Sequence, residues 1–276
     1  MDKKFVIFDG SALLHRAWHA LPPLTNKKGE LLNVVYGFAM IFLKVLKDLK
    51  PDYLAVTFDR KEPTFRHKEF KEYKANRVKQ VDEFYKQFPR VKELLETFNV
   101  PIFEKAGFEA DDLIGTISEK AGKEGFDKII VTGDLDTLQL IDDKTKVYTL
   151  RKGITDTVIY DFDAVKQRYG LKPEQMIDYK ALRGDPSDNI IGVKGVGEKT
   201  AGDLLKEFGS LENIYKFLEK EDSKKVKISD RVRALLLEQK KEALLSKRLV
   251  TIVRDIPMEL NLALRMIINI SIFAMQ

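Results

Sequence analysis

Aspartates recur in this sequence at places where an apolar run of strand type has just ended. The run 129–133 is followed by Asp134 and Asp136, and similar runs end at Asp9 and Asp59. A short, β-branched apolar run predicts a strand that is buried on both faces. Open α/β sheets bind their ligands beyond the carboxyl ends of such strands. The carboxylates are therefore predicted to meet at one edge of a sheet.

Further acidic residues stand in the loops and first helical turns that adjoin these strands. The set expected at the sheet edge is Asp9, Asp59, Glu109, Asp111, Asp112, Asp134, Asp136, Asp185 and Asp188. Such a cluster repels itself unless cations neutralise it. Oxygen ligands without Cys or His select hard ions such as Mg²⁺ or Mn²⁺. So many carboxylates indicate two ions, and two ions about 4 Å apart suit in-line phosphoryl displacement.

Ordinary structural roles explain some of these carboxylates equally well. Asp9 is compatible with a turn or a helix cap, Ser11 is another candidate cap, and acidic residues in a first helical turn suit the helix dipole. Three acidic residues within 109–112 are harder to explain in this way. A metal site therefore requires that the carboxylates meet in space.

The segment 60–92 is rich in Lys and Arg, with aromatic residues between them, and is called the basic arm. Its side chains that could contact an anion or a base are Arg66, Lys71, Tyr73, Lys74 and Arg77. One interpretation is a solvated helical insertion with paired charges. The interpretation that we favour is a partly mobile element that contacts a nucleic-acid backbone by charge and unstacked bases by aromatic rings.

A glycine-rich turn leads into a predicted helix near residue 199. Gly195-Val196-Gly197 lets backbone N–H groups approach an anion, and the positive end of the helix points there. Lys194 and Lys199 add charge. The same glycines also suit a simple helix-turn-helix connection, so a phosphate anchor is one of two interpretations.

Composition narrows the class of protein. The 276 residues include no Cys, which excludes a disulfide scaffold, a zinc ribbon and a thiol nucleophile. They include only three His, which argues against histidine-rich metal chemistry. A hydrophobic fraction of 44% supports a packed core, and a net charge of +5 fits an anionic partner. We see no signal peptide and no uncharged apolar run of about 18 residues. We therefore expect a soluble, cytoplasmic protein without a membrane partner.

Apolar runs alternate with helical patterns before about residue 183, and helices dominate after it. Strands are expected near 5–8, 52–58, 100–103, 128–133, 146–150 and 157–160, the last two forming a hairpin-like edge. This pattern predicts an α/β fold with a mostly parallel central sheet flanked by helices. We expect a core over 1–182 that includes the basic arm, and a helical subdomain over 183–260. No role is assigned to 261–276.

Taken in order, the motifs resemble the 5′-nuclease domain of bacterial DNA polymerase I, within the flap endonuclease family. The resemblance covers residues 5 to about 208 and is carried by Phe8-Asp9-Gly10-Ser11, Thr57-Phe58-Asp59, Phe65-Arg66-His67, Tyr73-Lys74-Ala75, Gly107-Phe108-Glu109-Ala110-Asp111-Asp112, Thr132-Gly133-Asp134-Leu135-Asp136, Gly184-Asp185-Pro186-Ser187-Asp188-Asn189 and Gly192-Val193-Lys194-Gly195-Val196-Gly197-Glu198-Lys199-Thr200-Ala201.

The resemblance implies a PIN-like sheet core, a helical arch above it and a helix-turn-helix platform beside it. It also implies Mg²⁺-dependent removal of 5′ flaps and 5′→3′ exonucleolytic cutting, in which Mn²⁺ can substitute. One ion would be held by Asp9, Asp59, Glu109 and Asp111, with Asp112 near both ions. The other would be held by Asp134, Asp136 and Asp188, with Asp185 in support.

The same resemblance implies roles for the cationic and platform residues. Lys74 and Arg77 would steer the scissile phosphate, and Arg66 would face the phosphodiester. Contacts with flap, nicked or gapped duplex DNA are assigned to Lys71, Tyr73, Lys194, Gly195, Val196, Gly197, Lys199 and Thr200. K⁺ often binds at the glycine turn in this family. A DNA polymerase, linked or separate, is the implied protein partner of a monomer.

Two departures from the family pattern leave questions open. Residues 76–88 lack the usual Pro-containing polar stretch, so the arch can differ in order or threading, and the end beyond 260 does not resemble a link to a polymerase. Three rival functions remain. A PIN-type ribonuclease would cut RNA without the platform, a branch-binding module would have lost metal ligands, and a Toprim-type site would place a glutamate at an earlier strand end.

Overall fold

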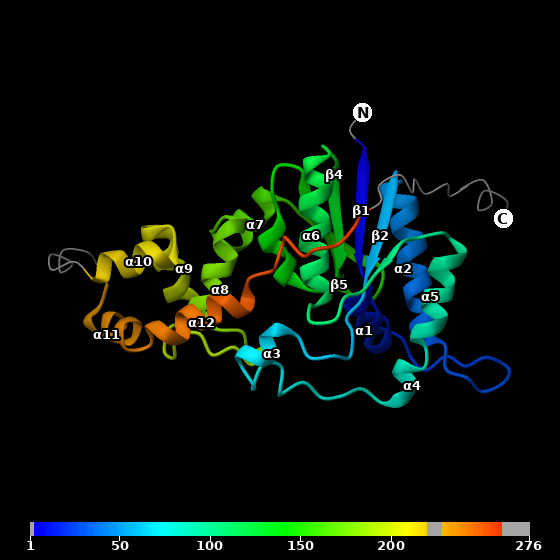
Figure 1. Cartoon of the computed structure of the whole chain (residues 1–276), viewed down its shortest axis with the longest axis horizontal. Helices are drawn as coiled ribbons and strands as arrows, with labels where there is room; N and C mark the ends of the chain where they lie inside the picture. The colour runs from blue at the N-terminus through cyan, green and yellow to red at the C-terminus, as the bar shows by residue number, and fades with distance from the viewer. Residues whose placement is uncertain (1–2, 220–227, 261–276) are drawn as a thin grey trace.

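The computed structural model describes residues 3–219 and 228–260, and the tail to which no role was assigned lies outside these ranges. The molecule is elongated, with a sheet-containing part at one end and a group of helices at the other (Figure 1). The sheet has six strands in the order β3-β2-β1-β4-β5-β6. These are β1 (Lys4–Asp9), β2 (Tyr53–Thr57), β3 (Ile102–Phe103), β4 (Asp127–Thr132), β5 (Thr145–Lys152) and β6 (Asp156–Tyr160).

All neighbouring strands are parallel except β5 and β6. This confirms the predicted mostly parallel sheet with a hairpin at one edge. In β1, Phe8 is in register with Val56 of β2 and Val131 of β4. The residues that follow these three strands therefore leave the sheet at the same edge.

Helices cover both faces of the sheet and build the second part of the molecule. Their bounds are α1 (Gly10–Ala20), α2 (Asn33–Leu49), α3 (Phe65–Glu69), α4 (Asp82–Tyr85), α5 (Phe88–Thr97), α6 (Ala110–Lys123), η1 (Leu135–Leu140), α7 (Phe162–Tyr169), η2 (Pro173–Gln175), α8 (Met176–Arg183), η3 (Pro186–Asp188), α9 (Glu198–Phe208), α10 (Leu211–Leu218), α11 (Asp230–Glu238) and α12 (Lys240–Val250), where η marks a 3₁₀ helix.

The strands alternate between two apolar clusters, one on each face. Phe5 and Ile7 pack with α6, whereas Val6 and Phe8 pack with α1, α2 and α5. Fully burying one such side chain stabilises the fold by about 1.5–3 kcal/mol. Strands that are apolar on both sides therefore fix the sheet between two helical layers, and their carboxyl ends stay in place for the site.

The basic arm is only partly helical, which corrects the expectation of a helical arch. Between α3 and α4, residues 70–81 form turns and extended chain below the carboxyl edge of the sheet (Figure 1). Lys74 has φ of 55°, a left-handed conformation that a right-handed helix cannot include. Its N–H donates to the Asp188 carbonyl at 2.9 Å. This hydrogen bond thus fixes the middle of the basic arm to the loop that carries Asp188.

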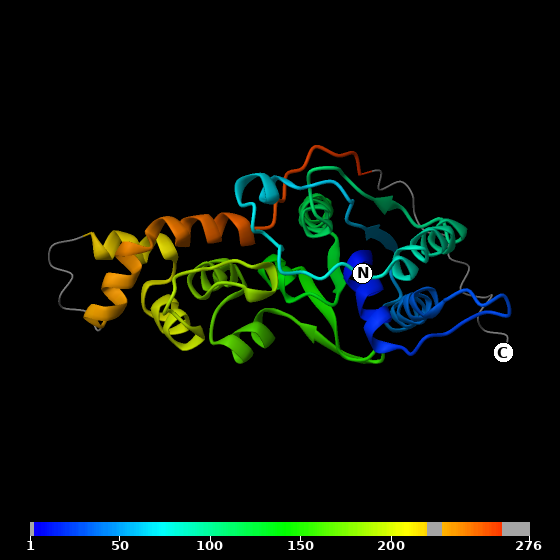
Figure 2. The same cartoon turned by 90° about the horizontal axis from the view of Figure 1, so that it is seen from below.

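The chain returns from the helical part to the sheet. After α12, residues 251–260, called the strap, run back along α6 (Figure 2). Ile252 and Ile256 of the strap are buried, and the Ile256 N–H donates to Thr116 Oγ1 at 3.2 Å. Within the described residues, no helix combines the length and apolar character needed to cross a membrane.

Candidate active site

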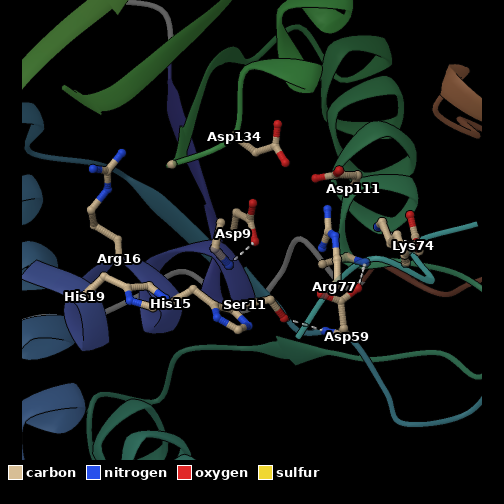
Figure 3. Close-up of a pocket in the computed structure, with 14 residues that line it drawn as sticks. Asp9, Ser11, His15, Arg16, His19, Asp59, Lys74, Arg77, Asp111 and Asp134 are labelled. Atoms are coloured by element: carbon tan, nitrogen blue, oxygen red, sulfur yellow. Dashed lines mark hydrogen bonds and ion pairs between the residues drawn. The ribbon is translucent and has the colours of Figure 1, made fainter. Parts of the chain in front are cut away.

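A pocket of about 340 Å³ opens at the carboxyl edge of the sheet. Asp9, Asp111 and Asp134 point toward one another there, with Lys74 and Arg77 on one side and three residues of α1 on the other (Figure 3). The lining side chains are Asp9, Ser11, Ala12, His15, Arg16, His19, Asp59, Lys74, Arg77, Glu109, Ala110, Asp111 and Asp134, with Gly133. The structure therefore brings together five of the nine predicted carboxylates in one cavity.

Asp9 is held at the junction between β1 and α1. It caps α1 by accepting the Ala12 N–H on Oδ1 at 2.9 Å, and its Oδ2 accepts the Thr132 hydroxyl at 2.6 Å. Ser11, the alternative cap, instead accepts the Asp59 N–H at 2.8 Å. A Cβ on Gly10 would lie 2.3 Å from the Phe58 ring. Only glycine therefore lets α1 start this close to the end of β2.

Thr132 links two of the carboxylates and was not predicted to belong to the site. Its hydroxyl donates to Asp9 and accepts the Asp134 N–H at 2.9 Å. Asp134 in turn accepts the Asp136 N–H at 2.9 Å and so caps η1. A hydroxyl at the end of β4 thus fixes the two carboxylate-bearing segments relative to each other. Its place directly before Gly133-Asp134 was the available sequence signal.

The N-terminus of α6 supplies the next carboxylates. The Ala110 N–H donates to Asp59 at 2.8 Å, which joins the end of β2 to α6. Glu109 accepts from Lys74 Nζ at 2.8 Å and from the Tyr73 hydroxyl at 3.0 Å. The basic arm therefore contributes both a cation and a buried hydroxyl to this acidic wall.

Asp136, Asp185 and Asp188 lie beside the pocket and each has a cationic partner. Lys180 of α8 contacts Asp136 and lies 2.7 Å from Asp185, and Arg77 pairs with Asp188. The loop that carries the last two is closed by Gly184 and Gly192. Both have positive φ, and a Cβ on Gly192 would meet the Gly184 backbone nitrogen at 2.2 Å.

Desolvation strongly raises the pKa values of three buried carboxylates. Burial, with smaller effects from the charges of Asp59 and Asp134, raises the pKa of Asp9 to about 7. Desolvation and the Asp134 charge raise the pKa of Asp136 to about 8, although Lys180 opposes them. Burial, followed by the charges of Asp9 and Asp134, holds the pKa of Asp111 well above its usual range. Acidic groups at this edge are thus costly to ionise in the protein alone.

Two other carboxylates are kept ionised by protein cations. Burial would raise the pKa of Glu109, but Lys74 and Arg66 outweigh it and lower that pKa. Burial also opposes ionisation of Asp185, yet Lys180 and Ser187 lower its pKa to about 2. Lysine and arginine therefore neutralise part of the cluster.

The donor set fits hard divalent cations. The pocket presents oxygen ligands, and the raised pKa values mark negative charge that is under-neutralised. Over residues 3–219 and 228–260, however, no three acidic or histidine side chains are already closed to the spacing of a metal centre. Ion pairs with Lys74, Lys180 and Arg77 hold Glu109, Asp136 and Asp188 instead, so cations of the protein neutralise part of this acidic edge.

Arg66 and Asp112 do not reach the pocket, which corrects two predictions. Asp112 is fully buried, and its carboxylate forms a bidentate pair with Arg66 at 2.7 and 2.8 Å. Arg66 also donates to the Leu249 and Thr251 carbonyls at 2.7 and 2.8 Å. With its donors used in this way, Arg66 cannot face a phosphodiester. The pair instead holds the basic arm, α6 and the end of α12 together.

Replacing Arg66 by Met is expected to lower the free energy of unfolding by about 3–5 kcal/mol, because the buried Asp112 carboxylate would lose its cationic partner and keep only backbone N–H donors. The double change Arg66→Met with Asp112→Leu should recover part of this loss. Urea unfolding measures the free energy of unfolding of the single and the double variant. Arg60→Met is the control, because the Arg60–Glu62 pair is exposed at the surface. Equal stability of Arg66→Met and the parent would contradict a structural role for the pair.

Several predicted DNA-contact residues are differently placed. Tyr73 is buried, with its hydroxyl 3.0 Å from Glu109 and 3.1 Å from Asp188, so its ring cannot stack on a free base. Val196 is buried in the core. Among the predicted DNA-contact residues, the exposed ones are Lys71, Lys194, Gly195, Gly197 and Lys199, and Thr200 is half-buried. The glycine turn leads directly into α9, as predicted.

Three residues on one side of α1 were missed as pocket residues. His15, Arg16 and His19 line the cavity opposite Lys74 and Arg77 (Figure 3). Their spacing on a helix that follows Asp9 was the signal. Burial lowers the pKa of His15, and its ring lies 4.6 Å from that of Phe84. Lys180, four residues before Gly184, was also missed.

Without divalent ions, stability should fall as pH rises from about 6.5 to about 8. The folded chain keeps protons on Asp9 and Asp136, with pKa values of about 7 and about 8, that an unfolded aspartate loses near pH 4. The folded state therefore binds more protons than the unfolded chain in this window, as it does from about pH 4 upward, so stability falls with rising pH until both carboxyl groups have ionised. His15 titrates below it, since its pKa is lowered.

We expect the metal-free Tm to fall by roughly 3 °C across this window. Excess Mg²⁺ should raise Tm most at the upper pH, because ion binding replaces the lost protons. Thermal unfolding in EDTA and in Mg²⁺ measures both curves. A metal-free Tm that rises with pH, or an equal Mg²⁺ effect at both ends, would contradict the assignment of Asp9 and Asp136.

Comparison with known proteins identifies the class. Residues 4–170 match the family described as 5′-3′ exonuclease, N-terminal resolvase-like domain, and residues 171–269 match 5′-3′ exonuclease, C-terminal SAM fold. The chain belongs to the 5′-3′ exonuclease family and is a nuclease.

Its relatives include longer proteins. The chain is 48% identical over 261 residues to DNA polymerase I of Bacillus subtilis, covering 95% of this chain and 29% of that protein. It is 46% identical to DNA polymerase I of Caldicellulosiruptor bescii, covering 94% and 30%. The chain thus spans less than a third of these relatives.

Solved structures share the fold. The T5 D15 protein co-crystallised with metal ions matches with a TM-score of 0.74 and 22% identity, covering 90% of this chain and 89% of that one. The catalytic core of Rad2 in complex with DNA substrate matches with a TM-score of 0.58 and 20% identity, covering 92% and 81%. At these identities the likeness is one of fold.

Proposed function

We propose that the protein is a structure-specific 5′ nuclease that hydrolyses phosphodiester bonds at 5′ flaps and 5′ ends of duplex DNA, with two Mg²⁺ ions. The observation that carries the proposal is the meeting of Asp9, Asp111 and Asp134 in a pocket flanked by cations (Figure 3). Three carboxylates that face one another in one pocket match a site completed by divalent ions. The family match supports phosphodiester hydrolysis.

The carboxylates divide into two neighbouring groups. Around the pocket, Asp9, Asp59, Glu109 and Asp111 would hold one ion, and Asp134 with the adjacent Asp136, Asp185 and Asp188 would hold the other. Bound divalent ions supply the charge that activates water and stabilises the leaving oxygen. The T5 5′-exonuclease structure with zinc bound supports a divalent cofactor.

The protein's own cations would act on the substrate phosphate. Lys74 and Arg77 line the pocket and pair with Glu109 and Asp188. When ions neutralise these carboxylates, the two side chains become free to contact a phosphate and the charge that develops on it.

The platform is proposed to bind duplex DNA behind the cut. Gly195, Gly197 and Lys199 are exposed where α9 begins, so its N–H groups can receive a backbone phosphate. K⁺ at this turn is part of the same proposal. The DNA-bound T5 D15 and Rad2 complexes share this fold. A DNA polymerase, joined in the named relatives, is the proposed partner of a monomeric nuclease.

Comparing a 5′-flap DNA duplex with single-stranded RNA of the same sequence tests the substrate class. We expect Mg²⁺-dependent cutting of the flap DNA at least roughly 100-fold faster than of the RNA, because only the branched duplex engages platform and pocket together. Equal or faster cutting of the RNA would favour a PIN-type ribonuclease and contradict the proposal.

A further inference from the structure

The strap and the end of α12 form a direct connection between the platform and the carboxylates. The platform turn, residues 192–197, is fixed at two places, to Gln239, the N-cap residue of α12, and to Ser246 within α12. The Lys194 N–H donates to Gln239 Oε1 at 2.8 Å, and the Gln239 amide donates back to the Lys194 carbonyl at 3.1 Å. The Gly192 N–H donates to Ser246 Oγ at 3.1 Å. Movement of the platform turn therefore moves α12.

Gln139 continues this connection into the site. It lies on η1, the 3₁₀ helix that carries Asp136, and its side chain is buried. Its amide Nε2 donates to the Asp136 carbonyl at 3.0 Å and to the Val250 carbonyl at 2.9 Å. Its Oε1 accepts the Ile252 N–H at 2.9 Å. One side chain thus bonds the backbone of a carboxylate residue to both sides of the junction between α12 and the strap.

Neighbouring contacts limit the freedom of the same junction. The Arg254 guanidinium donates to the Gln139 carbonyl at 2.6 Å. Asp112 accepts the Val253 N–H at 2.9 Å. The junction is therefore held on one side by Gln139 and on the other by the Arg66–Asp112 pair, but Gln139 alone reaches the Asp136 backbone within this described network.

We propose that Gln139 is a positioning residue that sets the cleavage register, the number of nucleotides between the duplex junction and the cut bond. This inference rests on the proposed function, in which the platform holds the duplex and the carboxylates hold the cut site. The distance between them then decides which phosphodiester enters the pocket. Successive phosphates of one strand are several ångströms apart, so a loosened junction admits neighbouring bonds.

The test maps the cleavage of a 5′-labelled flap duplex to the nucleotide for the parent and for Gln139→Met, which keeps the length of the side chain and removes all three hydrogen bonds. The matched control is Gln175→Met. Gln175 also lies on a 3₁₀ helix, donates to the Leu205 and Gly209 carbonyls at 3.0 and 2.9 Å, and accepts the Lys172 N–H at 2.9 Å. These bonds stay within the helical part and do not reach Asp136.

We expect Gln139→Met to raise the fraction of product displaced by one nucleotide roughly tenfold, because small misplacements change reaction rates strongly. Gln139→Glu keeps the acceptor for the Ile252 N–H and should therefore show a smaller spread of cleavage positions. It replaces Gln139→Met in the test if that variant does not fold. Gln175→Met should lose stability without changing the register. Thermal unfolding of each variant separates stability from register.

An unchanged register in both Gln139 variants, with loss of rate or Tm alone, would overturn the inference and leave the proposed function intact. An equal spread of cleavage positions in Gln175→Met would also overturn the inference, since loosening any helix would then change the register. A parent that fails to cut the flap would instead contradict the proposed function itself, and the positioning role with it.

Discussion

Replacing Asp134 by Ala is expected to lower the single-turnover rate of 5′-flap cleavage about 1000-fold, which corresponds to roughly 4 kcal/mol of lost transition-state stabilisation. Asp134 points into the pocket toward Asp9 and Asp111 (Figure 3). Its loss removes a carboxylate from the proposed metal site. Flap binding should change little, because the platform lies on separate elements. Rapid-quench kinetics and a binding titration in Ca²⁺ measure the two effects.

Asp134→Asn separates charge from structure in this experiment. In the parent, Asp134 caps η1 by accepting the Asp136 N–H on its side chain. The side-chain oxygen of Asn can accept the same N–H, so the 3₁₀ helix is preserved. The rate should nevertheless fall nearly as far as in the Ala variant. Asp143→Ala, which removes an exposed carboxylate outside the pocket, is the matched control. Full activity in either Asp134 variant would rule out the assigned role.

Lys74→Met is expected to lower the maximal cleavage rate about 100-fold, the usual effect of removing one cationic or hydrogen-bonding group from a developing negative charge. The Mg²⁺ concentration for half-maximal rate should fall at the same time. Lys74 is 2.8 Å from Glu109 and 3.7 Å from Asp188, so it competes with a metal for these carboxylates. Its removal weakens catalysis and strengthens ion binding together.

Lys71→Met is the control for Lys74, since Lys71 belongs to the same arm and is exposed to solvent. It should affect flap affinity and its salt dependence, as a backbone phosphate contact does, and leave the Mg²⁺ requirement unchanged. A Lys74 variant that needs more Mg²⁺ than the parent would show that the amino group supports ion binding, against the competition described here.

The strand ends were predictable because the physics that places them is local. Strands with apolar residues on both faces must lie between helical layers, and parallel neighbours bring Asp9 and Asp134 to one edge. The hairpin at β5 and β6 followed from alternation and the turn at Gly153. The hydrophobic periodicity and the residues at the strand ends were therefore enough to predict the sheet and the centre of the site.

Side-chain partners that depend on distant segments were not predictable in this way. Arg66 and Asp112 matched the expected motifs, yet the return of the chain after α12 captures Arg66 through the Leu249 and Thr251 carbonyls. Tyr73 looked like an exposed aromatic residue in a basic arm, but its hydroxyl is needed between two carboxylates. The sequence gives no local sign of such long-range pairing.

The most direct test of the two-ion account is cleavage of a labelled 5′-flap duplex by the parent chain over a Mg²⁺ titration, with the products mapped to the nucleotide. We predict no cutting in EDTA, and a rate that rises with about the second power of Mg²⁺ concentration when Mg²⁺ is scarce, since two ions are required. The cut should fall at one bond near the junction. Cutting in EDTA, or flap binding without cutting at any Mg²⁺ or Mn²⁺ concentration, would contradict the account.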